Sequence, residues 1–341
     1  MEEEDKYLPW IEKYRPKNFN EIIAHEDILK ILTRFIENNN LPHLLFYGPP
    51  GTCKTTTGRA IAQKIYGNSL SSMVLELNAS DERGIEVVRD KIKEFACTKK
   101  MFHTGVKFII LDEVDAMTND AQCALRRIIE KYTNNARFCL ICNYVNKVIP
   151  ALQSRCTRFR FTHLQQREMV EYLDMIIEKE GIKIDKEAKD AILMIAKGDM
   201  RKVLNLLQSV SFMKEESISE KDIYVASGLP IHSDMDYIIQ ILLNCDLESS
   251  MKKIENIIYE NGYSLLDIIE YIGEYLKLCI IPETELKRLY KHLSDIEYHL
   301  SYSSIEKVRC IQFISVFHEF QKKLGLNEYK KEEIKGGVED E

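Results

Sequence analysis

The stretch from Gly48 to Thr56 has the residue types and spacing of a phosphate-binding loop. It reads Gly-Pro-Pro-Gly-Thr-Cys-Lys-Thr-Thr and follows an apolar run at 43–47 that is typical of a buried strand. Backbone N–H groups in such a loop surround phosphate oxygens, and its lysine pairs with the β- and γ-phosphates of a nucleotide. The predicted nucleotide contacts in this loop are Gly48, Pro49, Pro50, Gly51, Thr52, Cys53, Lys54, Thr55 and Thr56.

Cys53 departs from the usual pattern, because the position before the lysine is normally glycine. A Cβ atom there crowds the phosphate or strains the loop. Cysteine is small, so nucleotide binding is still expected, with altered affinity or geometry. Two hypotheses therefore stay open for the site: it binds ATP and hydrolyses it, or it binds the nucleotide without turning it over.

Two acids, Asp112 and Glu113, follow the apolar run 108–111. A buried strand that ends in carboxylates delivers them to the sheet edge at which α/β proteins bind ligands. Together with the hydroxyl of Thr55, Asp112 is predicted to hold Mg²⁺, through a water molecule. Glu113 is the predicted general base that polarises the attacking water, and Lys54 completes this catalytic set. Asp115 is interpreted as a loop residue rather than a catalytic one.

The elements that position these residues alternate between strands and helices. Apolar runs predict strands at 43–47, 73–77, 106–111, 137–142 and 157–161. Helical spacing predicts helices at 26–38, 54–66, 84–96 and 119–132. Repeated strand–helix–strand order implies a parallel, doubly wound sheet. We therefore expect a nucleotide-binding α/β domain over 1–164.

The rest of the sequence is helical. Spacing predicts helices at 165–180, 186–197 and 200–214, and Ser219 with Asp222 forms a capping box that opens a fourth. Gly228-Leu-Pro230 breaks this pattern, so we expect a small helical lid domain over 165–228.

A second helical region follows, in which breaks are predicted at Gly262, Pro282 and 301–304. Typical helix lengths suggest a bundle of about five helices, which we interpret as an oligomerisation collar over 229–341. The expected fold class is thus α/β plus all-α.

Composition and charge limit the classes of protein to which the chain can belong. The chain has 341 residues with 14 glycines and 8 prolines, which excludes collagen-like, low-complexity and largely disordered classes. Its longest apolar run, 191–196, is far shorter than the roughly 20 residues of a membrane span, so no membrane contact is expected. The acidic residues 2–5 are unlike a leader peptide. A formal net charge of −7 means that any nucleic-acid contact must come from a local patch or from several chains together.

The nine cysteines are scattered along the chain. Cys139 and Cys142 form a Cys-x-x-Cys pair, but no second pair completes a zinc site. We interpret them as buried, reduced thiols within a strand, in a reducing compartment.

Several further segments resemble one protein family. They are LPWIEKYRP at 8–16, ELNASDERG at 76–84, ALRR at 124–127, SRC at 154–156 and GDMR at 198–201. Together with the loop and the paired acids, they make the chain similar to AAA+ ATPases and, within that class, to the small subunits of replication factor C, the eukaryotic sliding-clamp loader. The resemblance is dense from residue 7 to about 228 and loose beyond it. Segments 138–144 and 150–161 are closest in wording to one particular small subunit.

The resemblance implies ATP and Mg²⁺ as cofactors and further site residues. Asn143 resembles sensor 1, although a strand-ending asparagine in a turn is common. Arg201 resembles sensor 2, which ties the lid to phosphate; without the resemblance it is a solvated helix arginine. Arg155 resembles the arginine finger that enters the neighbouring subunit's ATP site, whereas by itself it suggests a structural salt bridge. Ile11 and Arg15 would border the adenine and ribose.

The resemblance also implies partners: other replication factor C subunits in a hetero-pentamer, the PCNA sliding clamp, primer–template DNA without sequence preference, and a nuclear location. Arg83 and Arg89 are nominated as phosphate contacts, although the residues alone favour a solvated helix. Met101 and Phe102 are nominated as clamp anchors, with core packing as an equal alternative. A different AAA+ machine that forms homohexamers is a further alternative.

Overall fold

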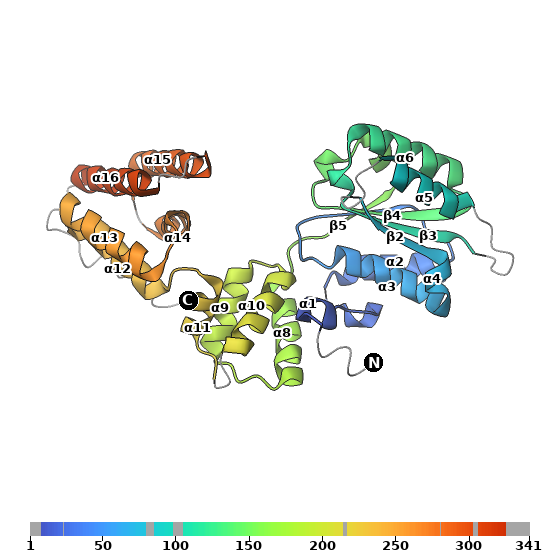
Figure 1. Ribbon diagram of the computed structural model, residues 1–341, viewed down its shortest axis with the longest axis horizontal. Coiled ribbons are helices and arrows are strands. Elements are labelled where there is room, and N and C mark those ends of the chain that lie inside the picture. The colour runs from blue at the N-terminus through green and yellow to red at the C-terminus, as the bar shows by residue number, and fades with distance from the viewer. Residues whose placement is uncertain are drawn as a thin grey trace. The chain divides into compact units, whose positions relative to one another are not determined.

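The computed structural model describes several stretches of the chain, and all structural statements below refer to them. They are 8–22, 24–79, 85–97, 105–213, 217–279, 281–302 and 306–324. The chain forms two compact units, Met1–Ile218 and Ser219–Glu341, and each is described by itself (Figure 1).

The first unit contains a five-stranded sheet in which every neighbouring pair of strands is parallel. The strand order is β2-β3-β4-β1-β5. The strands are β1 (Leu44–Tyr47), β2 (Val74–Asn78), β3 (Lys107–Asp112), β4 (Ala136–Cys142) and β5 (Thr157–Arg160). The predicted strands and their parallel arrangement are confirmed, with each end within one residue of its predicted place.

Helices cover both faces of this sheet (Figure 1). They include α2 (Glu26–Glu37), α3 (Lys54–Tyr66), α5 (Ile85–Cys97) and α6 (Asn119–Tyr132). Side chains alternate along β3, so Phe108 and Ile110 pack with α2 and α3, whereas Ile109 and Leu111 pack with α5 and α6. Burial on both faces explains why this strand is apolar without alternation, and each such side chain contributes about 1.5–3 kcal/mol to stability.

Three helices that fall within the predicted lid, and for which the word lid is kept below, complete the first unit. They are α8 (Gln166–Glu180), α9 (Lys186–Ala196) and α10 (Met200–Met213). Gly181 ends α8 with a φ of +66°, a backbone conformation that glycine adopts without steric cost. The three predicted helices are confirmed, again within one residue at each end.

The single-turn elements were not predicted from the sequence, because three or four residues are too few to show helical periodicity. They are α1 (Trp10–Lys13), α4 (Leu70–Met73), α7 (Pro150–Gln153) and the 3-10 turns Phe19–Glu21, Gly67–Ser69, Val114–Ala116 and Val145–Lys147.

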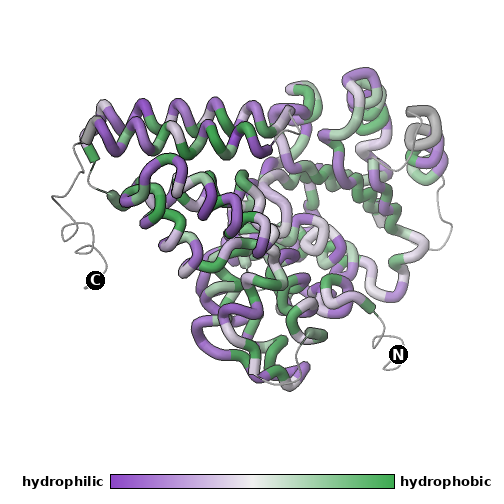
Figure 2. The backbone as a smooth tube through the Cα atoms, turned by 60° about the vertical axis from the view of Figure 1, so that its left-hand side comes forward, coloured by the Kyte–Doolittle hydropathy of each residue, from purple (hydrophilic) through white to green (hydrophobic). Residues whose placement is uncertain are grey.

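The second unit is helical throughout its described residues. Its helices are α11 (Glu220–Ser227), α12 (His232–Asn244), α13 (Leu247–Asn261), α14 (Leu265–Leu278), α15 (Glu283–Tyr302) and α16 (Glu306–Leu324). Hydrophobic and hydrophilic residues alternate along the turns of the helices (Figure 2). The apolar faces of α12 to α16 form one core that includes Ile238, Ile254, Ile268, Ile296 and Phe313.

The predicted breaks at Gly262 and Pro282 separate helices as expected. A further break before Leu247 was not predicted; there Asp246 caps α13 by accepting the backbone N–H of Ser249 at 3.3 Å. No described helix has the length and apolar character needed to cross a membrane.

Candidate nucleotide site

The loop from Gly48 to Cys53 joins β1 to α3 and is shaped by two glycines with positive φ. A Cβ on Gly48 would lie 1.9 Å from the backbone oxygen of Phe161, and a Cβ on Gly51 would lie 1.7 Å from Oδ1 of Asp199. Only glycine fits at either place. The second contact brings the loop directly against the start of α10, where the backbone N–H of Met200 donates to Gly51 at 3.4 Å.

Lys54 is the first residue of α3, and its ammonium group is buried within the loop. Its Nζ donates to the carbonyls of Gly48 at 2.8 Å and Pro49 at 2.7 Å. Burial lowers the pKa of this ammonium, and the carboxylate of Asp112 opposes that effect. A partly desolvated cation held among backbone dipoles is suited to pairing with phosphate oxygens.

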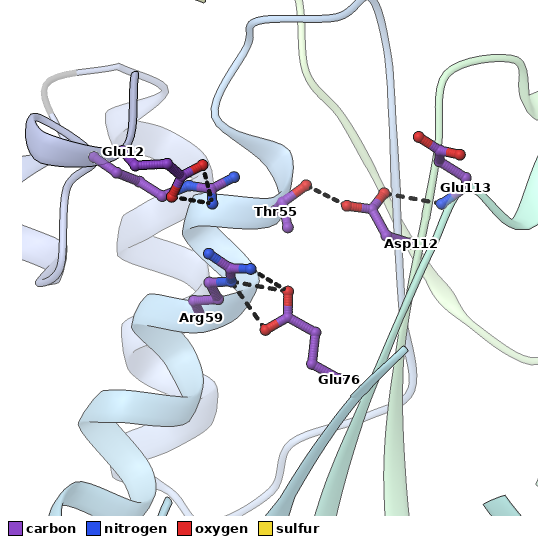
Figure 3. Close-up of polar contacts among 7 residues, drawn as sticks. Glu12, Thr55, Arg59, Glu76, Asp112 and Glu113 are labelled. Carbon is purple, nitrogen blue, oxygen red and sulfur yellow. Dashed lines mark hydrogen bonds and ion pairs between the residues drawn. The ribbon is translucent and has the colours of Figure 1, made fainter. Parts of the chain in front are cut away.

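Thr55 and Asp112 meet as the sequence predicted. Oγ1 of Thr55 donates to Oδ2 of Asp112 at 2.6 Å, and the backbone N–H of Glu113 donates to Oδ1 at 2.9 Å (Figure 3). Both carboxylate oxygens therefore have a fixed orientation. Hydroxyl and carboxylate oxygens are ligands that Mg²⁺ accepts, with nucleotide phosphates and water as the others, so the pair fits a Mg²⁺–nucleotide site.

Glu113 leaves the strand in the left-handed conformation, with a φ of +57°. Its side chain points away from the Thr55–Asp112 pair (Figure 3). Because the residue still lines the pocket, its carboxylate is available to water there.

Asp115 holds the neighbouring loop in place, which agrees with its interpretation from the sequence as a loop residue. Its Oδ2 accepts the backbone N–H groups of Asn143 at 3.2 Å and Tyr144 at 3.0 Å. This contact keeps Asn143, at the end of β4, in the lining of the pocket.

Cys53 occupies the turn before α3 with a φ of +65°. A residue with a Cβ is strained there by about 1–2 kcal/mol. Burial raises the pKa of its thiol to about 11, although Arg201 and Arg15 oppose the shift. The group is therefore a neutral thiol at physiological pH and a poor nucleophile.

The pocket is completed by the N-terminal segment and the lid. Of the predicted contacts, Ile11, Arg15 and Arg201 line it, together with loop residues Pro50 to Thr56. Gly48 and Pro49 instead shape the loop and hold Lys54. Sequence reasoning missed the lining residues Tyr14, Pro16, Glu21, Ile22, Ala24, Leu164, Glu168, Tyr172, Met200 and Leu204. Tyr14, Pro16 and Met200 lie within the segments 8–16 and 198–201 that resemble the family, so these motifs could have indicated them. The others carry no local signal, since the tertiary fold alone brings them to the loop.

Arg155 lies outside the lining of its own chain's pocket. It forms an ion pair with Glu130 of α6 and donates to the backbone oxygen of Ala151 at 2.6 Å. The side chain of Arg155 is about one-third exposed.

Comparison with known proteins identifies the family. A model of the ATPase family associated with various cellular activities matches residues 44–164, and a model of the replication factor C C-terminal domain matches 230–316. A probable replication factor C subunit 5 of Dictyostelium discoideum is 53% identical over 91% of this chain and 90% of its own length. The chain belongs to the replication factor C family.

Other relatives agree with this assignment. Replication factor C subunit 5 of Homo sapiens is 46% identical over 91% of each chain. Subunit 3 of Schizosaccharomyces pombe is 47% identical over 90% of each chain. The expectation that the sequence is closest to the small subunit called 3 in budding yeast and 5 in human is therefore confirmed at the level of subunit type.

The fold also matches a solved structure outside the replication factor C family. A single-substitution variant of RuvB from Thermotoga maritima superimposes with a TM-score of 0.51, covering 81% of this chain and 98% of that chain, at 17% identity. This likeness concerns the fold alone.

Of the predicted DNA and clamp contacts, Arg83, Met101 and Phe102 lie outside the described residues, and Arg89 lies within α5. Cys139 and Cys142 are buried within β4 as predicted, and all nine cysteines are free of disulfide bonds. Within the described part of the chain, no group of three or more His, Cys, Asp or Glu side chains forms a metal cluster.

Proposed function

We propose that this chain is a clamp-loader subunit that binds ATP with Mg²⁺ in the pocket between the phosphate-binding loop and the lid, and hydrolyses it. The observation that carries the proposal is the Thr55–Asp112 hydrogen bond of 2.6 Å next to the buried ammonium of Lys54. These groups come from α3 and β3 and converge where a nucleotide's β- and γ-phosphates would lie.

Each polar group in the pocket has a role in this proposal. When nucleotide binds, the Lys54 ammonium leaves the carbonyls of Gly48 and Pro49 and pairs with phosphate oxygens. Thr55 would hold Mg²⁺ directly and Asp112 would hold it through water, and the ion would supply positive charge against the phosphates. Glu113 polarises the attacking water, and Asn143 orients it. Arg201, at the start of α10, ties the lid to the nucleotide.

Arg155 is proposed to act in trans. Its side chain is partly exposed and does not line its own pocket, which suits a group that stabilises transferred phosphate charge in a neighbouring subunit. The Arg155 guanidinium would leave the carboxylate of Glu130 and pair with a γ-phosphate, so it would have an anionic partner in both states.

A second candidate function is nucleotide binding without hydrolysis, in the same kind of complex. The positive φ of Cys53 favours it, because strain and an added side chain at this point alter how the loop meets phosphate. The intact set of Lys54, Thr55, Asp112 and Glu113 favours hydrolysis, which we therefore prefer.

The wider proposal places the chain in a hetero-pentamer of replication factor C subunits that loads the PCNA clamp at primer–template junctions in the nucleus. The names of its relatives and the C-terminal domain match at 230–316 support this assembly. We propose Arg83 and Arg89 as DNA contacts, Met101 and Phe102 as clamp contacts, 165–228 as the lid and 229–341 as the collar.

Nucleotide binding by the purified full-length chain tests the core of this proposal. Fluorescent ATP with Mg²⁺ should bind to the wild type, and Lys54→Ala should weaken binding by roughly a hundredfold, since a charge-assisted phosphate contact is lost. Lys64→Ala is the matched control, because Lys64 lies exposed on the same helix. Equal affinities for all three proteins would refute the proposal.

A further inference from the structure

The N-terminal segment that borders the pocket is attached to the lid. Helix α1 packs against α10, and the backbone N–H of Trp10 donates to Oε1 of Gln208 in α10 at 3.1 Å. From α8, the hydroxyl of Tyr172 donates to the backbone carbonyl of Tyr14. Two lid helices therefore hold the segment from two sides.

Glu180, the last residue of α8, provides a third attachment. The ammonium of Lys13 and the hydroxyl of Tyr14 both donate to its Oε1. The side chains of Lys13 and Glu180 are 28% and 22% exposed, so the pair is partly shielded from water. Burial opposes ionisation of Glu180, yet the hydrogen bonds from Lys13 and Tyr14 lower the pKa of its carboxyl. The carboxylate therefore remains charged and able to hold both donors.

The segment contacts both the lid and the pocket, and Tyr14 takes part in both contacts. Residues four apart share a face of a helical turn, so Trp10 lies beside Tyr14, and their rings meet edge to face at 6.1 Å. Ile11 and Arg15 form the other pair, and both line the pocket. Each of these two directly follows a residue anchored to the lid. Glu180 itself is not part of the described pocket lining.

We propose that Glu180 is a positioning residue for recognition of the nucleoside part of ATP: by holding Lys13 and Tyr14 on the lid, it places Ile11 and Arg15 against the base and ribose. This inference rests on the proposed nucleotide site. The site then has two independent halves: Glu180 positions the nucleoside half, whereas the loop residues around Lys54 hold phosphate and do not depend on Glu180. Loss of the anchor should therefore affect the nucleoside contribution to binding alone.

Competition binding on the full-length chain tests this separation. Unlabelled ATP and inorganic tripolyphosphate, each with Mg²⁺, would displace a fluorescent ATP analogue. Glu180→Ala should weaken ATP binding by roughly tenfold, equivalent to about 1.4 kcal/mol, and leave tripolyphosphate affinity within about twofold of wild type. Asp174→Asn is the matched control; it breaks the α8–α9 ion pair with Lys189, 2.7 Å long, and should change neither affinity.

The partner side of the anchor gives an independent test. Lys13, which does not line the described pocket, supplies this test: Lys13→Met should reproduce most of the loss seen with Glu180→Ala, and combining the two changes should add nothing further, because one interaction is being removed. Additive losses, an ATP affinity unchanged by Glu180→Ala, or equal weakening of ATP and tripolyphosphate would each overturn the inference. A wild-type chain that binds neither ligand would overturn the proposed function itself.

Discussion

The hydroxyl of Thr55 donates a 2.6 Å hydrogen bond to Oδ2 of Asp112, and so joins the start of α3 to the end of β3 across 57 positions of sequence. The register of the parallel sheet explains the meeting: β1, which leads into the loop, and β3 both pair with β4, so their carboxyl ends lie at one edge. Two oxygen donors for a hard cation are thereby held together.

A second polar pair links neighbouring elements of the same region. The guanidinium of Arg59 in α3 contacts both carboxylate oxygens of Glu76 in β2, at 2.8 and 2.9 Å from Nε (Figure 3). Both side chains are partly exposed, so the pair contributes at most about 1 kcal/mol. Its effect is to hold the α3 helix against the edge strand.

Replacing Cys53 tests the strain in the loop. The free energy of unfolding of Cys53→Gly should be about 1 kcal/mol higher than that of Cys53→Ala, because a φ of +65° is costly only for a residue with a Cβ. Both variants lack the thiol, so the comparison isolates the backbone. Urea unfolding measures the difference, and equal stability of the two variants would show that the turn is unstrained.

Gln122 is expected to be a structural centre of the α6 region. Its buried amide donates to the carbonyls of Met117 at 3.2 Å and Lys147 at 3.0 Å, and accepts the N–H of Ile149 at 2.8 Å. Gln122→Ala should therefore lower the free energy of unfolding by about 2–4 kcal/mol, since buried partners lose their hydrogen bonds. Gln63→Ala, at an exposed site on α3, serves as control; similar losses in both variants would contradict this role.

Stability should fall in mild acid because of His43. Burial, reinforced by Arg137, lowers the pKa of this side chain to about 4, and its Nδ1 accepts the backbone N–H of Phe138 at 3.2 Å. Between pH 6.5 and 4 the unfolded chain binds a proton that the folded chain excludes, so the free energy of unfolding decreases as the pH falls, by up to about 3 kcal/mol.

Unfolding of wild type and His43→Gln at about pH 7 and about pH 5 measures this contribution. The variant should lose less stability between the two pH values than the wild type does. His299→Gln, at an exposed site on α15, should behave like the wild type. A His43→Gln profile parallel to that of the wild type would show that His43 is not the titrating group.

Arg155→Ala should separate action in trans from binding in cis. Its own chain's ATP affinity should stay within about twofold of wild type, since Arg155 does not line that pocket. Turnover by the assembled complex should fall by roughly tenfold or more, because an arginine finger stabilises transferred charge. Arg158→Ala, an exposed arginine nearby on β5, is the control. A loss of ATP affinity in the isolated variant would place Arg155 in cis instead.

Local sequence patterns predicted most of the fold. Strand β3 and helices α3 and α6 could be placed to within a residue because apolar runs and helical periodicity are local properties. The turn α7 and the break before Leu247 were not predicted, since a single helical turn has no period and Asp246 resembles any polar residue within a helix.

The candidate site also has residues that the sequence predicted and residues that it did not. The loop, Asp112 and Glu113 lie within motifs, so their meeting could be predicted. Tyr172 could not be assigned to the pocket, because its place there depends on how the N-terminal segment packs on the lid. The pairing of Arg155 with Glu130 was foreseen only as a general alternative to its role in trans.

ATP turnover by the reconstituted complex, with clamp and primed DNA, tests directly whether this site hydrolyses ATP. Wild type would be compared with Lys54→Ala in this subunit alone, and with Lys64→Ala as control. If the site hydrolyses ATP, Lys54→Ala should clearly lower turnover and clamp loading, whereas Lys64→Ala should not. Unchanged turnover in the Lys54→Ala complex would contradict hydrolysis at this site, and would leave the chain as a structural subunit that provides Arg155.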